Sequence, residues 1–270
     1  MCGNEVTMKH DLLIIMPAYN EEASIGKFLS SLKEFGIMEY ADIIVINDAS
    51  ADHTAEILQM LNVPFISHPY NLGYGAALQT GYKYAVTGGY RYVIQMDSDG
   101  QHDACNIPKI YDCLRQKDAS GNRPDLVIGS RFLKESQSFP MPFTKKVAIR
   151  FFGRVIKIAS HQVITDPTSG LQGLNRRVFE YYARFGNFDN NYPDANMLVQ
   201  MSLLGYQIKE IPATMHKRTA GKSMHFGIIE PLLYMCIMLF STYNVFVRSK
   251  WKLLQQPIYD KGGNNPNEKI

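Results

Sequence analysis

The sequence is poor in cysteine. Its four cysteines are scattered along the chain, at Cys2, Cys105, Cys113 and Cys236. They form no C-x-x-C pair and lack the spacing of metal ligands, which favours a reducing compartment where cysteines act mainly as small packing groups. A signal peptide is also missing, because Asp11 interrupts the early apolar run and the apolar residues 12–16 are too few. We therefore predict a cytoplasmic protein.

Excess charge of one sign and the common nucleotide-binding motifs are lacking as well. The net charge of the 270 residues is only +3, which gives no electrostatic reason to expect a nucleic-acid partner. The P-loop signature G-x-x-x-x-G-K-[S/T] is absent, and G-x-G-x-x-G does not follow the first predicted strand. Those absences argue against a P-loop nucleotidase and a dinucleotide dehydrogenase. Without a G-x-S-x-G elbow, an α/β-hydrolase has little support either.

What the sequence does contain is an alternation of strands and helices. We predict strands at residues 12–16, 43–46, 64–67 and 90–96, with helices between them. Pro17 is expected to end the first strand, and Asn20 to cap a helix with acids in its first turn and an apolar face that reaches Phe35. This alternation predicts a parallel, doubly wound α/β sheet, whose ligands bind beyond the carboxyl ends of the strands.

The stretch Asp97-Ser98-Asp99-Gly100-Gln101 follows the fourth predicted strand. In an extended chain, residues i and i+2 point to the same side, so Asp97 and Asp99 would place two carboxylates together, with Gln101 as a candidate third oxygen ligand. Like charges held so close repel and usually need a cation between them, and oxygen ligands favour Mg²⁺ or Mn²⁺. The alternative is a polar loop that merely follows a strand.

The second half of the chain is less regular. We predict helices at residues 106–117, 145–160, 176–183 and 194–204, and strands at 125–128 and 208–211. On the helix at 145–160, Lys146, Arg150 and Arg154 recur at every fourth position, and apolar residues occupy the other side. This pattern is typical of a helix on a membrane surface, or of an ordinary amphipathic helix packed on the sheet.

Residues 228–247 are nearly all apolar, interrupted by Glu230 and Pro231. A membrane span needs about 20 consecutive apolar residues, so an interfacial or partner-binding helix fits this run better than a full span. A cationic and aromatic cluster suited to lipid headgroups follows at residues 248–252. We predict an apolar or amphipathic helical segment at 226–253 and a disordered tail at 254–270.

Four motifs occur in order: Pro-Ala-Tyr-Asn-Glu-Glu at 17–22, Asn-Asp-Ala-Ser at 47–50, Asn-Leu-Gly-Tyr-Gly at 71–75 and Asp-Ser-Asp-Gly-Gln-His at 97–102. Together they resemble the family 2 inverting glycosyltransferases. Gly-Ser-Arg at 129–131, Asp-Pro-Thr-Ser-Gly at 166–170 and Arg-Thr-Ala-Gly-Lys-Ser at 218–223 are similar to the branch of dolichyl- and polyprenyl-phosphate sugar synthases. The resemblance implies a GT-A domain over residues 1–225, with a mixed sheet flanked by helices, a nucleotide-sugar donor and a divalent metal.

The resemblance also assigns donor-binding residues. They are Pro17, Tyr19, Glu21, Asp48, Gly75, Asp97 and Lys222. Considered without the resemblance, Tyr19 is equally a core aromatic and Glu21 a first-turn helix acid. Asn47 stands where the family often has a first acid, so the choice between a UDP- and a GDP-sugar stays open.

The resemblance assigns the metal to Asp99, with Gln101 and Asp97 as further ligands, so that the ion bridges the donor diphosphate. Such an ion stabilises the negative charge left on the diphosphate when the sugar departs. Arg131 and Lys222 are candidate cations for the phosphates, and either is alternatively a solvated surface group.

The acceptor is predicted from its protonation chemistry. A lipid phosphate is largely ionised near pH 7, because the second pKa of such a monoester is about 6; it needs cations, whereas a sugar hydroxyl needs a general base. We assign Arg131, Lys146 and Arg150 to an acceptor phosphate. Asp194 lies where many family members carry an acidic base, and is alternatively a helix N-terminal acid.

Three functions remain open from the sequence. The first is transfer of a sugar to a polyprenyl phosphate at the cytoplasmic face of the membrane, with a small membrane protein docked on residues 228–247. The second is transfer to a hydroxyl of a lipid-linked or cell-surface glycan. The third is a catalytically silent nucleotide-binding scaffold, against which the intact Asp97 and Asp99 pair argues.

Overall fold

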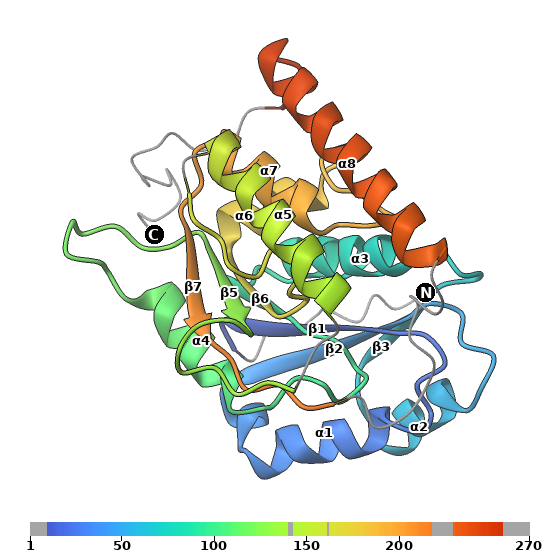
Figure 1. Ribbon diagram of the computed structural model, residues 1–270. Coiled ribbons are helices and arrows are strands. Elements are labelled where there is room, and N and C mark those ends of the chain that lie inside the picture. Colours follow the sequence, from blue (N-terminus) through green and yellow to red (C-terminus); the bar gives the residue numbers. More distant parts are fainter. Residues whose placement is uncertain (1–9, 140–142, 161, 218–228, 256–270) are drawn as a thin grey trace.

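A seven-stranded sheet runs through the part of the chain that the computed structural model describes, residues 10–139, 143–160, 162–217 and 229–255. Its strands lie in the order β3-β2-β1-β4-β6-β5-β7 (Figure 1). They are β1 (Leu12–Ala18), β2 (Ala41–Asn47), β3 (Phe65–Ser67), β4 (Tyr92–Gln95), β5 (Leu126–Ser130), β6 (Gln172–Asn175) and β7 (Ile208–Pro212). The first four strands pair in parallel, as do β5 and β7, whereas β6 is antiparallel to both of its neighbours. The sheet is mixed, which confirms the α/β class predicted for a GT-A domain and corrects the purely parallel sheet expected from the strand–helix alternation.

Helices cover both faces of this sheet (Figure 1). They are α1 (Ile25–Glu34), α2 (Thr54–Met60), α3 (Tyr74–Thr87), α4 (Asn106–Arg115), α5 (Phe143–Ser160), α6 (Arg176–Ala183), α7 (Ala195–Leu203) and α8 (Ile229–Lys250). Alternate residues of β1 enter two separate cores: Ile14 packs with α1, α2 and α4, and Ile15 packs with α3 and α5 to α8. A central strand buried on both faces reads as a continuous apolar run, which explains why β1 was predictable.

β1 extends beyond its predicted end, through Pro17 to Ala18, which pairs with Asn47 of β2. The carbonyl of Pro17 accepts a hydrogen bond from Ser98 Oγ at 2.8 Å, so it points toward the neighbouring strand β4 and away from β2. Because the amide nitrogen of a strand residue points to the same side as its carbonyl, the missing N–H of Pro17 costs the ladder with β2 nothing. The prediction that Pro17 ends this strand was wrong.

The first helix begins later than predicted, at Ile25, and has no acid in its first turn. Asn20 instead adopts a left-handed conformation with φ 54°, and its side chain accepts a hydrogen bond from the Ala51 amide at 2.8 Å. An asparagine tolerates that conformation in a turn, so residues 20–24 form a connection to the loop after β2. Phe35 lies past the end of α1 and is 54% exposed, which corrects its predicted place on the apolar face.

Helix α5 is amphipathic in the structure, and its predicted contact with a membrane surface stays a prediction. Ile149, Phe152 and Ile156 are buried, and the helix packs on α7, as an ordinary amphipathic helix packs on its neighbour. Arg150 and Arg154 are exposed on its outer side. Helix α8 packs on α7 (Figure 1). Among the described residues, no helix combines the length and apolarity that crossing a membrane requires. Residues 256–270 of the predicted tail lie outside the described residues.

Candidate active site

The Asp97 carboxylate lies in the loop that leaves β4. Tyr74 at the start of α3 donates its hydroxyl to Asp97 Oδ1 at 2.9 Å, and His102 Nε2 lies 3.2 Å from Oδ2. The loop before β6 passes directly over this carboxylate, because a Cβ added to Gly170 would lie 2.9 Å from Asp97 Oδ2. Two other segments, the start of α3 and the loop before β6, therefore converge on the loop that carries Asp97.

Asp99 is buried beside it, with 7% of its surface exposed, and its Oδ1 accepts a hydrogen bond from the Gln101 amide at 2.9 Å. β4 ends at Gln95, so the two acids lie in the loop, and the alternation of an extended strand is not what places them. That part of the argument for the pair was wrong, although both acids do follow the carboxyl end of the strand.

Arg131, at the end of β5, is held by a buried carboxylate. Its Nε and one terminal nitrogen form a two-pronged pair with Asp166 at 2.7 and 2.6 Å, and Thr168 Oγ1 accepts a further bond at 2.9 Å. Asp166 is fully buried and its backbone amide is fixed by Glu210 of β7. Burial, the largest influence, lowers the pKa of Arg131, but the hydrogen bonds and charge of Asp166 outweigh it and raise that pKa. Arg131 is therefore a fixed, permanently charged group.

Asp194 is the residue before α7 and does not cap that helix with its side chain. Burial raises the pKa of the Tyr74 hydroxyl well above its usual value, and the negative charges of Asp97 and Asp194 raise it further. The same two carboxylates contribute to the raised pKa of Arg131. Asp97, Asp194 and Arg131, predicted from three distant motifs, are thus close enough to interact electrostatically.

The proposed donor-binding residues lie at the ends of β1 and β2. Tyr19 is 50% exposed, while Glu21 is buried and accepts a hydrogen bond from Ser24 Oγ. The buried Asp48 carboxylate accepts the Leu72 and Gly73 amides at 2.9 and 2.8 Å. Asp48 therefore shapes the loop that leads into α3, and contact of its carboxylate with a nucleoside stays a prediction.

The other predicted residues are placed less fully. A Cβ added to Gly75 would lie 2.3 Å from the carbonyl oxygen of Asp189, so this glycine lets α3 approach the segment that carries Asp194. Lys222 lies outside the described residues, and Lys146 is described only as part of α5. Arg150 is exposed on the same helix.

The donor set around Asp97 and Asp99 fits a hard divalent ion bound together with a substrate. Both offer carboxylate oxygens, the ligands that Mg²⁺ and Mn²⁺ prefer. Within the described ranges, no group of three or more His, Cys, Asp or Glu side chains forms a complete cage. An ion here would therefore take its remaining ligands from water and from the phosphates of a donor.

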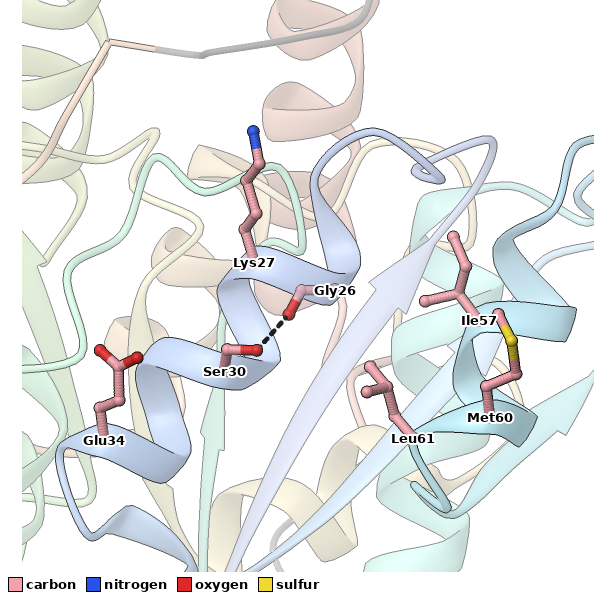
Figure 2. A pocket seen from close by; sticks show the side chains of 7 residues that line it. All are labelled: Gly26, Lys27, Ser30, Glu34, Ile57, Met60 and Leu61. Carbon is pink, nitrogen blue, oxygen red and sulfur yellow. Dashed lines mark hydrogen bonds between the residues drawn. The ribbon is translucent and has the colours of Figure 1, made fainter.

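A groove of about 600 Å³ lies elsewhere, between α1 and α2 (Figure 2). Its lining residues are Gly26, Lys27, Ser30, Glu34, Ile57, Met60 and Leu61. None of the predicted site residues lines it, and it presents no paired carboxylates.

Residues 13–183 match the family model described as Glycosyl transferase family 2. The chain belongs to this family. The protein is therefore a glycosyltransferase, as its motifs predicted.

Two relatives of this glycosyltransferase have informative names. The UDP-N-acetylglucosamine–dolichyl-phosphate N-acetylglucosaminyltransferase of Methanococcus voltae is 29% identical over 63% of this chain and 71% of its own. The undecaprenyl-phosphate mannosyltransferase of Micrococcus luteus is 26% identical over 81% of this chain and 89% of its own. A solved structure of glucosyl-3-phosphoglycerate synthase from Mycobacterium tuberculosis, in complex with Mn²⁺, UDP-glucose and phosphoglyceric acid, superposes with a TM-score of 0.63. It is 16% identical over 94% of this glycosyltransferase and 82% of its own chain, which shows the fold.

Sequence reasoning missed three contributors to the site. Tyr74 and His102 belong to motifs that were recognised, but their contacts with Asp97 were not predicted. Asp166 was likewise seen only as part of a loop motif, although it holds Arg131. The available signal was that Asp166 is an acid in a recognised motif to which no role had been assigned.

Proposed function

We propose that this glycosyltransferase moves a sugar from a nucleotide-diphospho-sugar to a polyprenyl phosphate at the cytoplasmic face of the membrane, with inversion at the anomeric carbon. The observation that carries the proposal is the geometry around Asp97, which contacts Tyr74 of α3 and lies under the loop before β6, the loop whose Asp166 holds Arg131. The names of the Methanococcus and Micrococcus relatives support a lipid phosphate as acceptor.

In this proposal, Asp97 and Asp99 hold Mg²⁺ or Mn²⁺, with Gln101 as a further oxygen donor. The ion supplies positive charge to the diphosphate that leaves. Arg131, kept charged and oriented by Asp166, binds a phosphate of the donor or of the acceptor. An ionised acceptor phosphate attacks the anomeric carbon from the face opposite the departing diphosphate, so the sugar–phosphate bond to the nucleotide breaks as the new one forms.

The acceptor phosphate needs no proton removed, so Asp194 serves here mainly to orient groups by charge. The alternative acceptor, a glycan hydroxyl, would need Asp194 as a general base. The names of the Micrococcus and Methanococcus relatives favour the phosphate acceptor.

An acceptor screen tests the proposal. The purified protein with Mn²⁺ is incubated with UDP- and GDP-sugars, with or without a short polyprenyl phosphate, and nucleoside diphosphate release is measured. We expect release that requires the lipid phosphate, and only a mild loss in Asp194→Asn. Release that requires a glycan instead and vanishes in Asp194→Asn would favour the hydroxyl acceptor, and no release with any donor would favour the silent scaffold.

The outer faces of α5 and α8 supply the proposed membrane contact. On α8, Phe240 and Tyr243 are 71% and 66% exposed, and Trp251 just beyond it is 73% exposed. On α5, the exposed side chains of Phe151 and Arg154 lie three positions apart, on the same face of the helix. Aromatic side chains next to cations suit the headgroup layer of an anionic membrane. A small membrane protein docked on α8 is the other proposed partner for this surface.

We expect the protein to sediment with vesicles of phosphatidylglycerol and phosphatidylcholine, and Phe240→Ser with Tyr243→Ser to weaken that binding several-fold. Met60→Ser is the matched control, since Met60 is 77% exposed on α2, which covers the other face of the sheet. Equal vesicle binding by both variants would show that α8 is not the contact surface.

A further inference from the structure

The segment that carries Asp194 is fixed by a network of polar groups centred on the buried Asn196. Asp189 Oδ1 accepts the amides of Asn191 and Tyr192 at 2.9 and 3.1 Å. Asn196 Oδ1 accepts the amide of Asp194 at 2.9 Å. Two side chains, Asp189 and Asn196, thereby define the backbone of the whole segment.

The same two side chains are tied to α8. The Asn196 amide nitrogen donates to Asp189 Oδ2 at 2.7 Å and to Ser241 Oγ at 2.8 Å. Ser241 Oγ in turn donates to Asp189 Oδ2 at 3.2 Å. Asn196 is 1% exposed, so its amide hydrogens have no access to water, and a lost partner would be costly. Ser241, which lies 45 positions after Asn196, thus completes the support of Asp194.

Apolar packing also holds α8 in place. Met238 and Val245 are buried and belong to the same core as α7. The neighbouring Thr242 is 3% exposed, and its hydroxyl has no hydrogen-bond partner among the described residues. On this helix the hydroxyl at 242 is a packing group, whereas the hydroxyl at 241 meets two polar side chains of the active-site segment.

We propose that Ser241 is a positioning residue through which the seating of α8 on α7 fixes Asp194 in the active site. The proposal rests on the proposed role of Asp194 and deepens it, because it makes the reaction sensitive to the state of α8. The helix that presents Phe240 and Tyr243 to its surroundings is then the helix that completes the catalytic segment. Binding of a membrane or partner at the outer face of α8 and sugar transfer at the active site are then linked through the hydroxyl of Ser241.

The test compares two variants that each remove one hydroxyl from α8. In Ser241→Ala we expect kcat with a polyprenyl phosphate to fall about 5-fold, the effect of losing roughly one buried hydrogen bond and no more than the mild loss expected for Asp194→Asn, with the donor KM changed less than about 2-fold. Thr242→Val should keep kcat within about 2-fold, and Ser241→Thr should restore most of the loss. Hydrogen exchange should quicken at the amides of Asn191, Tyr192 and Asp194 in Ser241→Ala, and not in Thr242→Val.

A double-mutant cycle separates positioning from general destabilisation. In the Asp194→Asn background, Ser241→Ala should lower kcat no further. An equal loss in both backgrounds, or an exchange pattern in Ser241→Ala like that of Thr242→Val, would overturn the proposal. If Asp194→Asn alone leaves kcat unchanged, the proposed role of Asp194 fails with it, and the exchange measurement still reports whether Ser241 supports the segment.

Discussion

Asp99→Asn is expected to lower sugar transfer by at least about 10³-fold, because it removes charge from the group that would hold the metal against the leaving diphosphate. The substitution keeps the size of the side chain, so the Oδ1 acceptor for the Gln101 amide remains in place. The measurement is nucleoside diphosphate release at saturating donor and Mn²⁺. Titration of Mn²⁺ in the presence of UDP should show weakened binding of the ion.

Asp112→Asn is the matched control, because Asp112 is exposed on α4 and belongs to none of the motifs. Its activity and thermal midpoint should equal those of the unmodified protein, and removal of the metal by a chelator should reproduce the loss seen in Asp99→Asn. Transfer that survives in Asp99→Asn at ordinary Mn²⁺ would contradict the assignment of Asp99 to the metal.

Arg131→Met is expected to lower the free energy of unfolding by about 3–5 kcal/mol, because it strands the fully buried Asp166 carboxylate without its partner. Chemical denaturation measures this loss. The stability of Arg131→Lys should lie between that of the unmodified protein and that of Arg131→Met, since an ammonium keeps the charge but cannot make the two-pronged contact.

The double variant Arg131→Met with Asp166→Leu is the control for this pair. Replacing both members of a buried pair leaves no unpaired charge, so it should be more stable than Arg131→Met alone. The double variant should nevertheless fail to transfer sugar, because the guanidinium of Arg131 is gone. If Arg131→Met is as stable as the parent, the pair does not hold the loop; if the double variant transfers sugar at the parental rate, Arg131 does not bind a phosphate.

Features that lie within one motif were predictable from the sequence. The apolar run of β1, the acids at Asp97 and Asp99, and the apolar face of α5 each depend on neighbouring residues and on periodicity. The start of α1 was mispredicted for the same reason: Asn20 has the local features of a helix cap, but its side chain bonds Ala51, which lies 31 positions away.

Contacts between distant segments could not be predicted, because they depend on the order of strands in the sheet. Arg131 and Asp166 are 35 positions apart and meet because β5 and β6 are neighbours. Asn196 illustrates the limit best. At the start of a helix it has the features of a cap, whereas in the structure it links Asp194 to Ser241 of α8.

The central claim is that the sugar is transferred to a phosphate, and the linkage of the product tests it most directly. The protein is incubated with radiolabelled nucleotide-sugar, Mn²⁺ and a polyprenyl phosphate, and the organic phase is then treated with mild acid. We predict label in the organic phase that depends on Asp99 and is released by the acid, because a sugar joined through its anomeric carbon to a phosphate is a labile diester. Label that resists mild acid, or that enters the organic phase only with an acceptor bearing a free hydroxyl, would contradict the account.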